Sequence, residues 1–362
     1  MALSLPSSVT SQQAADTTDR PFWSVMIPTF WPSTDYLRQA LEGVLWQDPG
    51  PDEMQIEVID DCSLDVDVSA LVRSIAGDRV VVMRNPTNLG LAGAWNRCVE
   101  RAYGEWIHIL HQDDLVFPGF YPELRKVIGD FPAAGAAFCR HAYLDEHSAW
   151  TELSSIESHQ RTLLPDWQFR QTVSQRMQCP AVVVRRAVYD QVGGFRTDLP
   201  YCLDWEMWAR IAASFPVAYC PAILAGYRRH NESETSRLLL NGMGVSDPLR
   251  ALAISLERLP PDRRSAAKQD FSQMFASRLM QFTVEAYLNG RYEIAIEMVR
   301  QVSVLPLSRR DRRELYRISR NSRLKRLLCA IGLPRSSSGP VALPMPSVRM
   351  ARSAARPEIR RA

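Results

Sequence analysis

The sequence predicts an α/β protein with a mixed, mainly parallel sheet flanked by helices, followed by a C-terminal helical appendage. Two observations predict this fold class. Apolar runs of strand length alternate with segments whose apolar residues recur at helical spacing, and short links join the two. Such alternation is typical of parallel strands joined by right-handed crossovers. From about residue 248 the spacing is helical throughout, which predicts the appendage.

The first part of the chain supplies the centre of the predicted sheet. Each apolar run leads through a polar turn into a helical pattern, and the first helix opens at Thr34. Its apolar residues form a core stripe that comprises Leu37, Ala40, Leu41, Val44 and Leu45. Strands are expected at residues 22–29, 54–59, 80–84 and 105–110, and helices at 34–45, 67–76 and 94–102.

The pattern is looser beyond residue 114. Further strands are expected at 135–139, 181–184, 217–219 and 223–227, with a helix at 205–214, a turn at Gly193-Gly194-Phe195 and a long polar loop at 147–166. In the appendage, two helical segments flank Asn289 and Gly290, which predicts a helical hairpin. No second copy of this hairpin pattern follows, so a helical repeat is not expected.

Composition bounds the class of protein. The chain of 362 residues is 46% hydrophobic and 23% charged, which suits a globular protein of one or two domains. No run of eighteen apolar residues occurs, and the N-terminus lacks the basic start and apolar core of a secretory signal. The seven cysteines form no C-x-x-C pair, so reduced and mostly buried thiols are expected. We therefore expect a cytoplasmic protein.

Four parts are expected along the chain. They are a disordered N-terminal segment at 1–20, a main domain at 21–240, the helical appendage at 241–331, and a basic, Pro/Ser-rich disordered tail at 332–362. The net charge is only +3, but basic residues are concentrated near the C-terminus. They are Arg309, Arg310, Arg312, Arg313, Arg317, Arg320, Arg323, Lys325, Arg326 and Arg335. This stretch is either a solvated helix face or a surface for an anionic membrane or acceptor.

Two adjacent carboxylates, Asp113 and Asp114, directly follow the strand expected at 105–110. Two carboxylates beside a buried strand are costly unless positive charge lies next to them. A divalent cation that also carries phosphate oxygens meets this need, because hard cations take oxygen ligands. We therefore predict a metal and diphosphate site at the carboxyl end of the sheet, where open α/β folds bind their ligands.

Other polar residues are expected along the same edge. Thr29 ends the first strand, Asp61 follows the second, and Asp204 and His230 come after the sheet. Taken singly, each has an ordinary structural explanation such as helix capping or an exposed turn. Their joint occurrence in this order is far more specific for a ligand site.

These motifs resemble those of family 2 glycosyltransferases, which have the GT-A fold. The resemblance covers roughly Pro21 to Thr235. The matching segments are residues 25–30, 57–63, 88–96, 110–114, 182–186 with 192–195, 203–208 and 227–230. The resemblance implies an inverting enzyme that moves a sugar from a nucleoside-diphosphate sugar, UDP-linked, to a hydroxyl of a glycan or lipid-linked acceptor. Cell-surface polysaccharide or lipopolysaccharide synthesis is the implied context.

The resemblance also implies roles for single residues on the donor side. Asp61 would accept a hydrogen bond from the base of the donor nucleotide. Pro28, Thr29 and Phe30 would line the nucleoside pocket, and Asn96 and Asp113 are further candidates for the nucleotide side. Arg228 and Arg229 would neutralise the leaving diphosphate.

The same resemblance implies a divalent cation, Mn²⁺ or Mg²⁺, held by Asp114, Asp113 and His230. The family's metal motif is Asp-x-Asp, and here His111 occupies its first position. Asp204 matches the family's catalytic aspartate and is the candidate general base, although a capping role for the following helix is compatible with it.

Two alternatives remain beside the enzyme. A nucleotidyltransferase of the same fold would need a glycine-rich basic loop after the first strand, whereas residues 28–33 contain no glycine. The second alternative is a catalytically weak or inactive scaffold that binds nucleotide and, through the appendage, a partner. This alternative stays open because His111 replaces the first aspartate of the metal motif. The expected partners are a nucleotide-sugar donor, a glycan or lipid-linked acceptor, and the anionic inner face of the membrane through the basic C-terminal region. No nucleic-acid partner is expected.

Overall fold

The computed structural model describes residues 20–230, 238, 243–288, 290, 292–303, 307 and 309–330. The disordered segments expected at 1–20 and 332–362 thus lie outside the described residues, apart from Arg20. The chain divides into two compact units, and the boundary falls between Leu279 and Met280. Both residues belong to helix α10 (Pro261–Leu288), so the first part of this helix groups with the sheet.

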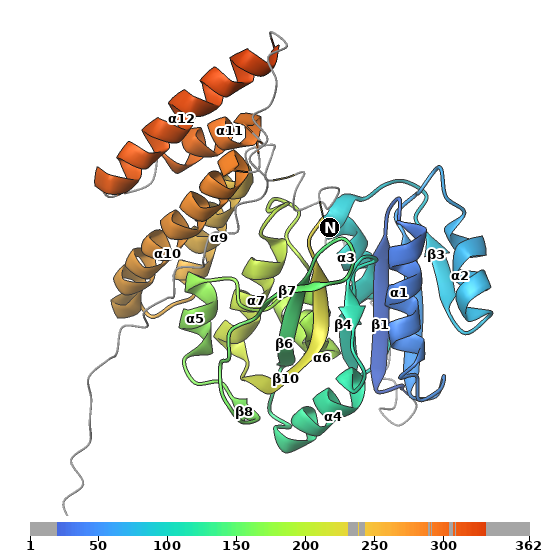
Figure 1. Cartoon of the computed structure of the whole chain (residues 1–362). Helices are drawn as coiled ribbons and strands as arrows, with labels where there is room; N and C mark the ends of the chain where they lie inside the picture. The colour runs from blue at the N-terminus through green and yellow to red at the C-terminus, as the bar shows by residue number, and fades with distance from the viewer. Residues whose placement is uncertain are drawn as a thin grey trace, which may run out of the picture. The chain divides into compact units, whose positions relative to one another are not determined.

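The first unit is built on a ten-stranded sheet (Figure 1). The strand order is β3-β2-β1-β4-β9-β6-β10-β5, with β7 beside β6 and β8 beside β10. The strands are β1 (Trp23–Thr29), β2 (Met54–Asp60), β3 (Val81–Arg84), β4 (Trp106–Ile109), β5 (Leu115–Val116), β6 (Ala136–Leu144), β7 (Trp150–Leu153), β8 (Thr162–Leu163), β9 (Val182–Arg185) and β10 (Val217–Arg228).

The predicted fold class, a mixed and mainly parallel sheet with helices on both faces, is confirmed. β1 runs parallel to β2 and β4, and β10 runs parallel to β6. β9 is antiparallel to both of its neighbours, β4 and β6. Pro28 is tolerated in the central strand β1 because the pairing with β4 ends at Met26, so no ladder bond is lost on that side.

Helices cover both faces of the sheet and bury a core on each (Figure 1). They are α1 (Thr34–Leu45), α2 (Val68–Ala76), α3 (Gly90–Arg101), α4 (Phe120–Asp130), α5 (Trp167–Val173), α6 (Arg186–Val192) and α7 (Leu203–Ser214). Alternate residues of β1 enter different cores. Val25 and Ile27 pack in the core that includes residues of α1, α2 and α4, whereas Met26 packs with residues of α3, α6 and α7.

Several sequence predictions need correction. The polar segment 147–166 is not a continuous loop, because β7 and β8 lie within it. The two strands expected at 217–219 and 223–227 are one strand, β10, with irregular register beside β6 between Cys220 and Ala225. Helix α3 begins at Gly90, before the predicted residue 94, because the Asp61 carboxylate accepts hydrogen bonds from the amides at its start.

The predicted helical hairpin is present. α10 is followed by α11 (Tyr292–Val302), and Gly290 between them has a positive φ of 72°. α9 (Met243–Glu257) precedes the pair, and α12 (Arg309–Ala330) follows it. In the second unit, Ala286, Ala295 and Ile318 pack together as a small apolar cluster.

Within the described residues, no helix combines the length and apolar character needed to span a bilayer. All six described free cysteines are buried or half-buried, as predicted.

Candidate active site

The candidate site lies where the direction of strand order reverses. The chain moves outward from β1 through β2 to β3 and then returns to β4 on the other side of β1. The helices α1 and α4, which follow these two parts of the sheet, pack in the same core, so the segments that leave the carboxyl ends of β1 and β4 lie side by side at the position where such sheets bind their ligands. Gln112 joins these segments, because its side chain accepts from the Phe30 amide at 2.8 Å and donates to the Phe30 carbonyl at 3.1 Å.

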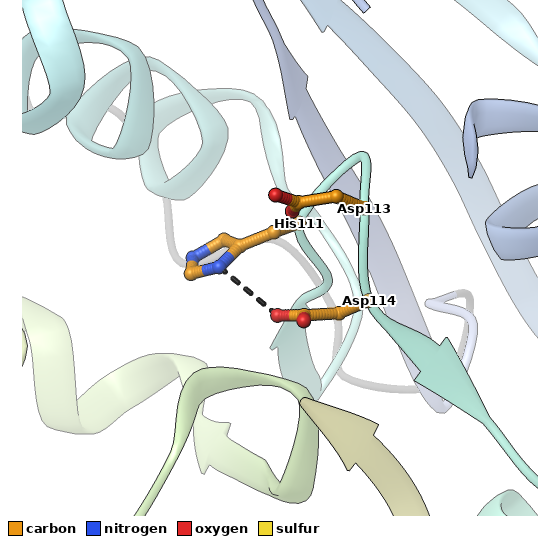
Figure 2. A group of neighbouring side chains, drawn as sticks. All are labelled: His111, Asp113 and Asp114. Atoms are coloured by element: carbon orange, nitrogen blue, oxygen red, sulfur yellow. Dashed lines mark ion pairs between the residues drawn. The ribbon is translucent and has the colours of Figure 1, made fainter. Parts of the chain in front are cut away.

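The turn between β4 and β5 brings His111, Asp113 and Asp114 together. Suitable ligand atoms of the three side chains all lie within 4.8 Å of one another. Figure 2 shows all three on this turn, with an ion pair between His111 and Asp114. His111 Nδ1 lies 3.2 Å from Asp114 Oδ2, and the His111 ring stacks on Trp95 with centroids 4.7 Å apart. The sequence-predicted carboxylate pair is thus a compact cluster that includes the irregular His111.

The electrostatics of this cluster are set by burial and by charge pairing. Burial raises the pKa of Asp114 to about 6, although His111 partly offsets this. Burial also opposes ionisation of Asp113, but hydrogen bonding from His230 and the charge of His111 lower its pKa. Burial opposes protonation of His111, whereas the nearby carboxylates, Asp114 first, outweigh it and raise its pKa. The cluster therefore concentrates negative charge beside two imidazoles.

The donor atoms of this turn fit a divalent cation. Asp114 is 1% exposed. Within the described chain, the buried Nε2 atom of His111 has no hydrogen-bond partner, and Asp114 Oδ2 has the ion pair with His111 Nδ1 as its contact. Buried polar atoms without partners are costly, and carboxylate oxygen and imidazole nitrogen are both ligands of Mn²⁺. The residues that are present thus suit the metal that the sequence predicts.

His230 reaches the same turn from the end of β10. Its Nε2 atom lies 2.8 Å from Asp113 Oδ2, and its ring packs against Tyr36 with centroids 5.4 Å apart. The hydrogen bond with Asp113 raises the pKa of His230. The structure therefore places His230 beside Asp113, and binding of a metal by His230 stays a prediction.

The two arginines before His230 lie in different environments. Arg228 is 2% exposed, and its guanidinium donates hydrogen bonds within the protein. The Arg229 guanidinium lies 3.6 Å from the centre of the Tyr143 ring and donates to Glu152 at 3.1 Å. Arg229 has 42% of its side chain exposed. Of the two candidates for a diphosphate, only Arg229 presents its charge to solvent.

Asp61 is buried at the end of β2 and organises the next loop. Its carboxylate accepts from the Asn85 side chain at 2.8 Å and from the amides of Leu89 at 2.9 Å and Gly90 at 3.0 Å. These amides belong to the start of α3, so the carboxylate stabilises the helix N-terminus through charge and hydrogen bonding. Contact between Asp61 and a nucleotide base stays a prediction.

Asn96 and the residues at the end of β1 have different contacts. Asn96 exchanges two hydrogen bonds with the backbone of Phe195, at 2.7 Å and 3.0 Å. It thereby fixes the turn at 193–195, and its amide faces this turn. Thr29 is buried, whereas Phe30 is 39% exposed and stacks on Trp31. Phe30 is thus the more accessible of the residues predicted to line the nucleoside pocket.

Asp204 lies in the first turn of α7, although the residue that precedes the helix as its cap is Cys202. Its Oδ2 atom accepts from Gln175 Nε2 at 2.6 Å, and Oδ1 accepts from the Trp205 amide at 2.7 Å. Burial raises the pKa of Asp204 to about 6, even though these bonds and the charge of His111 oppose the shift. A carboxylate with this pKa can accept a proton near neutral pH.

Two residues of the site were missed by sequence reasoning. Gln112 fixes Phe30, and Gln175 holds Asp204, but a single glutamine in a turn gives no spacing signal. Trp95 and Trp208 are buried core residues. Trp205 is also buried, and its indole N–H donates to the Gln171 carbonyl.

The fold described so far is that of an α/β protein with a polar cluster at the carboxyl end of its sheet, and comparisons with known proteins identify its family. Residues 24–193 match the family described as Glycosyl transferase family 2. An uncharacterized protein of Mycobacterium tuberculosis is 30% identical over 68% of this chain and 80% of its own length. The chain belongs to glycosyltransferase family 2, and it is a transferase enzyme.

Further relatives agree with this assignment. The succinoglycan biosynthesis protein ExoO of Rhizobium meliloti is 38% identical over 29% of this chain and 28% of its own length. The crystal structure of S. aureus TarS 1-349 in complex with UDP-GlcNAc superposes with a TM-score of 0.56 at 15% identity, covering 86% of this chain and 92% of that one. The mannosyltransferase PcManGT of Pyrobaculum calidifontis, in complex with GDP-Man and Mn²⁺, gives 0.54 at 16% identity, covering 86% and 88%. At these identities the structures show the GT-A fold.

Replacing Asp61 by alanine should destabilise the protein by about 1–3 kcal/mol, because buried amides at the start of α3 lose their acceptor. Asp67→Ala is the matched control, since the Asp67 carboxylate accepts from the Ala70 amide at the exposed start of α2, and its loss should cost about 1 kcal/mol. Urea unfolding of both variants measures the difference. Equal losses would contradict the organising role of Asp61.

Proposed function

We propose that this enzyme transfers a sugar from a UDP-sugar to a hydroxyl of a glycan or lipid-linked acceptor, with inversion at the anomeric carbon. The observation that carries the proposal is the cluster of Asp113, Asp114 and His111 in the turn that follows β4, where the strand order reverses. The relative that acts in succinoglycan biosynthesis supports a role in cell-surface polysaccharide synthesis. The neighbours in complex with UDP-GlcNAc and GDP-Man support a nucleotide-sugar donor.

On the donor side, we propose that Asp114 and Asp113 hold Mn²⁺ or Mg²⁺ and that His230, which is bonded to Asp113, completes the site. Such a cation, when bound, neutralises charge on the departing diphosphate. The neighbour in complex with GDP-Man and Mn²⁺ supports this assignment. Phe30 offers an exposed ring at the end of β1 for the nucleoside, beside Pro28 and Thr29. Arg229 is the candidate cation of this chain for the diphosphate.

On the acceptor side, we propose that Asp204 removes the proton from the attacking hydroxyl. Its carboxylate is held by Gln175 and by the start of α7, so it presents a fixed acceptor. The neighbouring acid Glu206 has a different task. It pairs with Arg210, which donates to the carbonyls of Val192 and Gly194. Residues two positions apart on a helix do not share a face, so Asp204 and Glu206 on α7 have different contacts.

Asp114→Asn should weaken Mn²⁺ binding in the presence of UDP by more than the roughly 10- to 100-fold that loss of an outer-shell partner costs. The physical reason is loss of a buried negative ligand oxygen. Calorimetric titration of Mn²⁺ measures the effect, and EDTA should abolish turnover of the parent enzyme. Asp78→Asn is the control, because the Asp78 side chain is 99% exposed. Unchanged Mn²⁺ affinity in Asp114→Asn would show that Asp114 is not a metal ligand.

The Asp204 assignment predicts a pH profile. The base is active when deprotonated, and burial raises its pKa to about 6, so kcat/KM should rise through pH 6 and level off above pH 7. In Asp204→Asn, kcat/KM should be lower by roughly 10²–10⁴-fold and should not rise through pH 6. Nucleotide-binding strength, measured separately, should change little. Nucleotide binding without turnover in the parent enzyme would favour the scaffold alternative.

We also propose peripheral contact between α12 and an anionic membrane at the inner face. In this helix Leu315 and Ile318 are buried, and the opposite surface carries exposed arginines. They are Arg309, Arg310, Arg312, Arg313, Arg317, Arg320 and Arg323. Tyr316 is 70% exposed among them, and amphipathic aromatic side chains suit the interface between headgroups and water. Anionic headgroups attract each basic side chain by about 1 kcal/mol.

A triple variant with Arg313, Arg317 and Arg320 changed to Gln should bind phosphatidylglycerol vesicles about 3 kcal/mol more weakly than the parent. Vesicle flotation at low and high salt measures the change. The control changes Arg73, Arg97 and Arg125, which lie on the first unit, and should bind like the parent. If the α12 variant and the control variant bind phosphatidylglycerol vesicles equally, α12 is not the membrane contact. If the parent binds neutral vesicles as well as anionic ones, the contact is not electrostatic.

A further inference from the structure

Arg228 is an unusual arginine because it is almost fully buried beside the candidate metal site. It is 2% exposed and lies at the last position of β10. Its backbone amide donates to Asp114 Oδ1 at 2.9 Å. Its Nε atom donates to the backbone carbonyl of Asp113 at 2.8 Å. Arg228 therefore contacts both aspartates: its backbone amide bonds the Asp114 carboxylate, and its side chain bonds the Asp113 backbone.

The two terminal nitrogen atoms of the guanidinium also donate hydrogen bonds within the protein. Nη1 donates to Ser148 Oγ at 2.7 Å, and Nη2 donates to Gln39 Oε1 at 2.8 Å. Ser148 also donates to Gln39 at 3.2 Å, which closes the set of bonds. Gln39 belongs to α1, whereas Ser148 lies in the turn between β6 and β7. Arg228 thus links α1, this turn, β10 and the turn that carries the two aspartates.

An aromatic ring completes this environment. The Arg228 guanidinium lies 4.2 Å from the centre of the Tyr36 ring, and the same ring contacts His230. Tyr36 is itself held by a hydrogen bond from its hydroxyl to the Glu146 carbonyl at 3.0 Å. The ring therefore supports Arg228 and His230 together, and His230 is bonded to Asp113. The orientation of the two aspartates therefore depends on Arg228, which contacts both of them, and on His230, which contacts Asp113.

These contacts need the shape of arginine as well as its charge. Three separate nitrogen atoms donate in three directions, and a planar fork fixes them relative to one another. A lysine has one nitrogen at the end of a flexible stem, so it cannot reproduce the set. The guanidinium donates its hydrogen bonds inside the protein, to the Asp113 carbonyl, the Ser148 hydroxyl and the Gln39 side chain.

We propose that Arg228 is a positioning residue that fixes Asp113 and Asp114 in the orientation needed to hold the metal and diphosphate. The inference rests on the proposed role of the two aspartates and goes beyond it. It assigns to Arg228 a contact with the turn that carries the ligands in place of the diphosphate contact expected from sequence. Loss of outer-shell partners typically costs about 10- to 100-fold in metal affinity.

The test is Arg228→Lys, studied by Mn²⁺ titration with UDP present and monitored by electron paramagnetic resonance. Mn²⁺ affinity should fall about 10- to 100-fold, and activity should recover when Mn²⁺ is raised in proportion. Arg161→Lys is the matched control, because Arg161 pairs with Glu123 and Asp130 on a different part of the unit. It should bind Mn²⁺ like the parent enzyme.

A second variant keeps the test decisive if Arg228→Lys does not fold. Gln39→Ala removes one acceptor of the guanidinium and leaves Arg228 in place, so Mn²⁺ affinity should fall in the same direction but less. Folded variants at both positions with parent-like Mn²⁺ affinity would overturn the proposal. Parent enzyme that binds UDP but no Mn²⁺ would instead overturn the proposed metal role of the aspartates, so the two failures are distinguishable.

Discussion

The pairing of Asp114 with its surroundings is the interaction on which the rest of the site depends. Two adjacent carboxylates at the end of a buried strand would repel each other and lose hydration. The protein offsets this cost with His111 on one side and the Arg228 amide on the other. His230 adds a bond to Asp113. Because these partners come from β4 and β10, the site exists only when the distant parts of the sheet are assembled.

The same requirement explains how the donor and acceptor sides are joined. Trp95 lies under His111 and also packs edge-on against Phe195 at 5.0 Å. Asn96 bonds the backbone of Phe195, and Arg210 on α7 bonds the carbonyl of Gly194. The turn at 193–195 is therefore held from α3 and from α7, and α7 carries Asp204. Buried aromatic and polar contacts thus link the turn that carries His111 to α7, the helix of the proposed base Asp204.

The fold was predictable because its signals are local. Apolar periodicity located the strands and helices of the first half, and the Asp113-Asp114 pair was visible as charge at a strand end. The functions of Arg228 and Asn96 could not be predicted, because they depend on contacts more than ninety residues away in sequence with Asp113 and Phe195. β10 was divided into two predicted strands because the irregular register near Ile223 interrupts its pattern.

We propose that Asp113 and Asp114 hold a divalent cation in the turn that follows β4, and X-ray diffraction at the manganese absorption edge, from crystals grown with UDP and Mn²⁺, tests this binding. One anomalous peak is expected about 2.0–2.3 Å from a carboxylate oxygen of this pair. A peak at another position, or bound UDP with no peak beside these carboxylates, would contradict it.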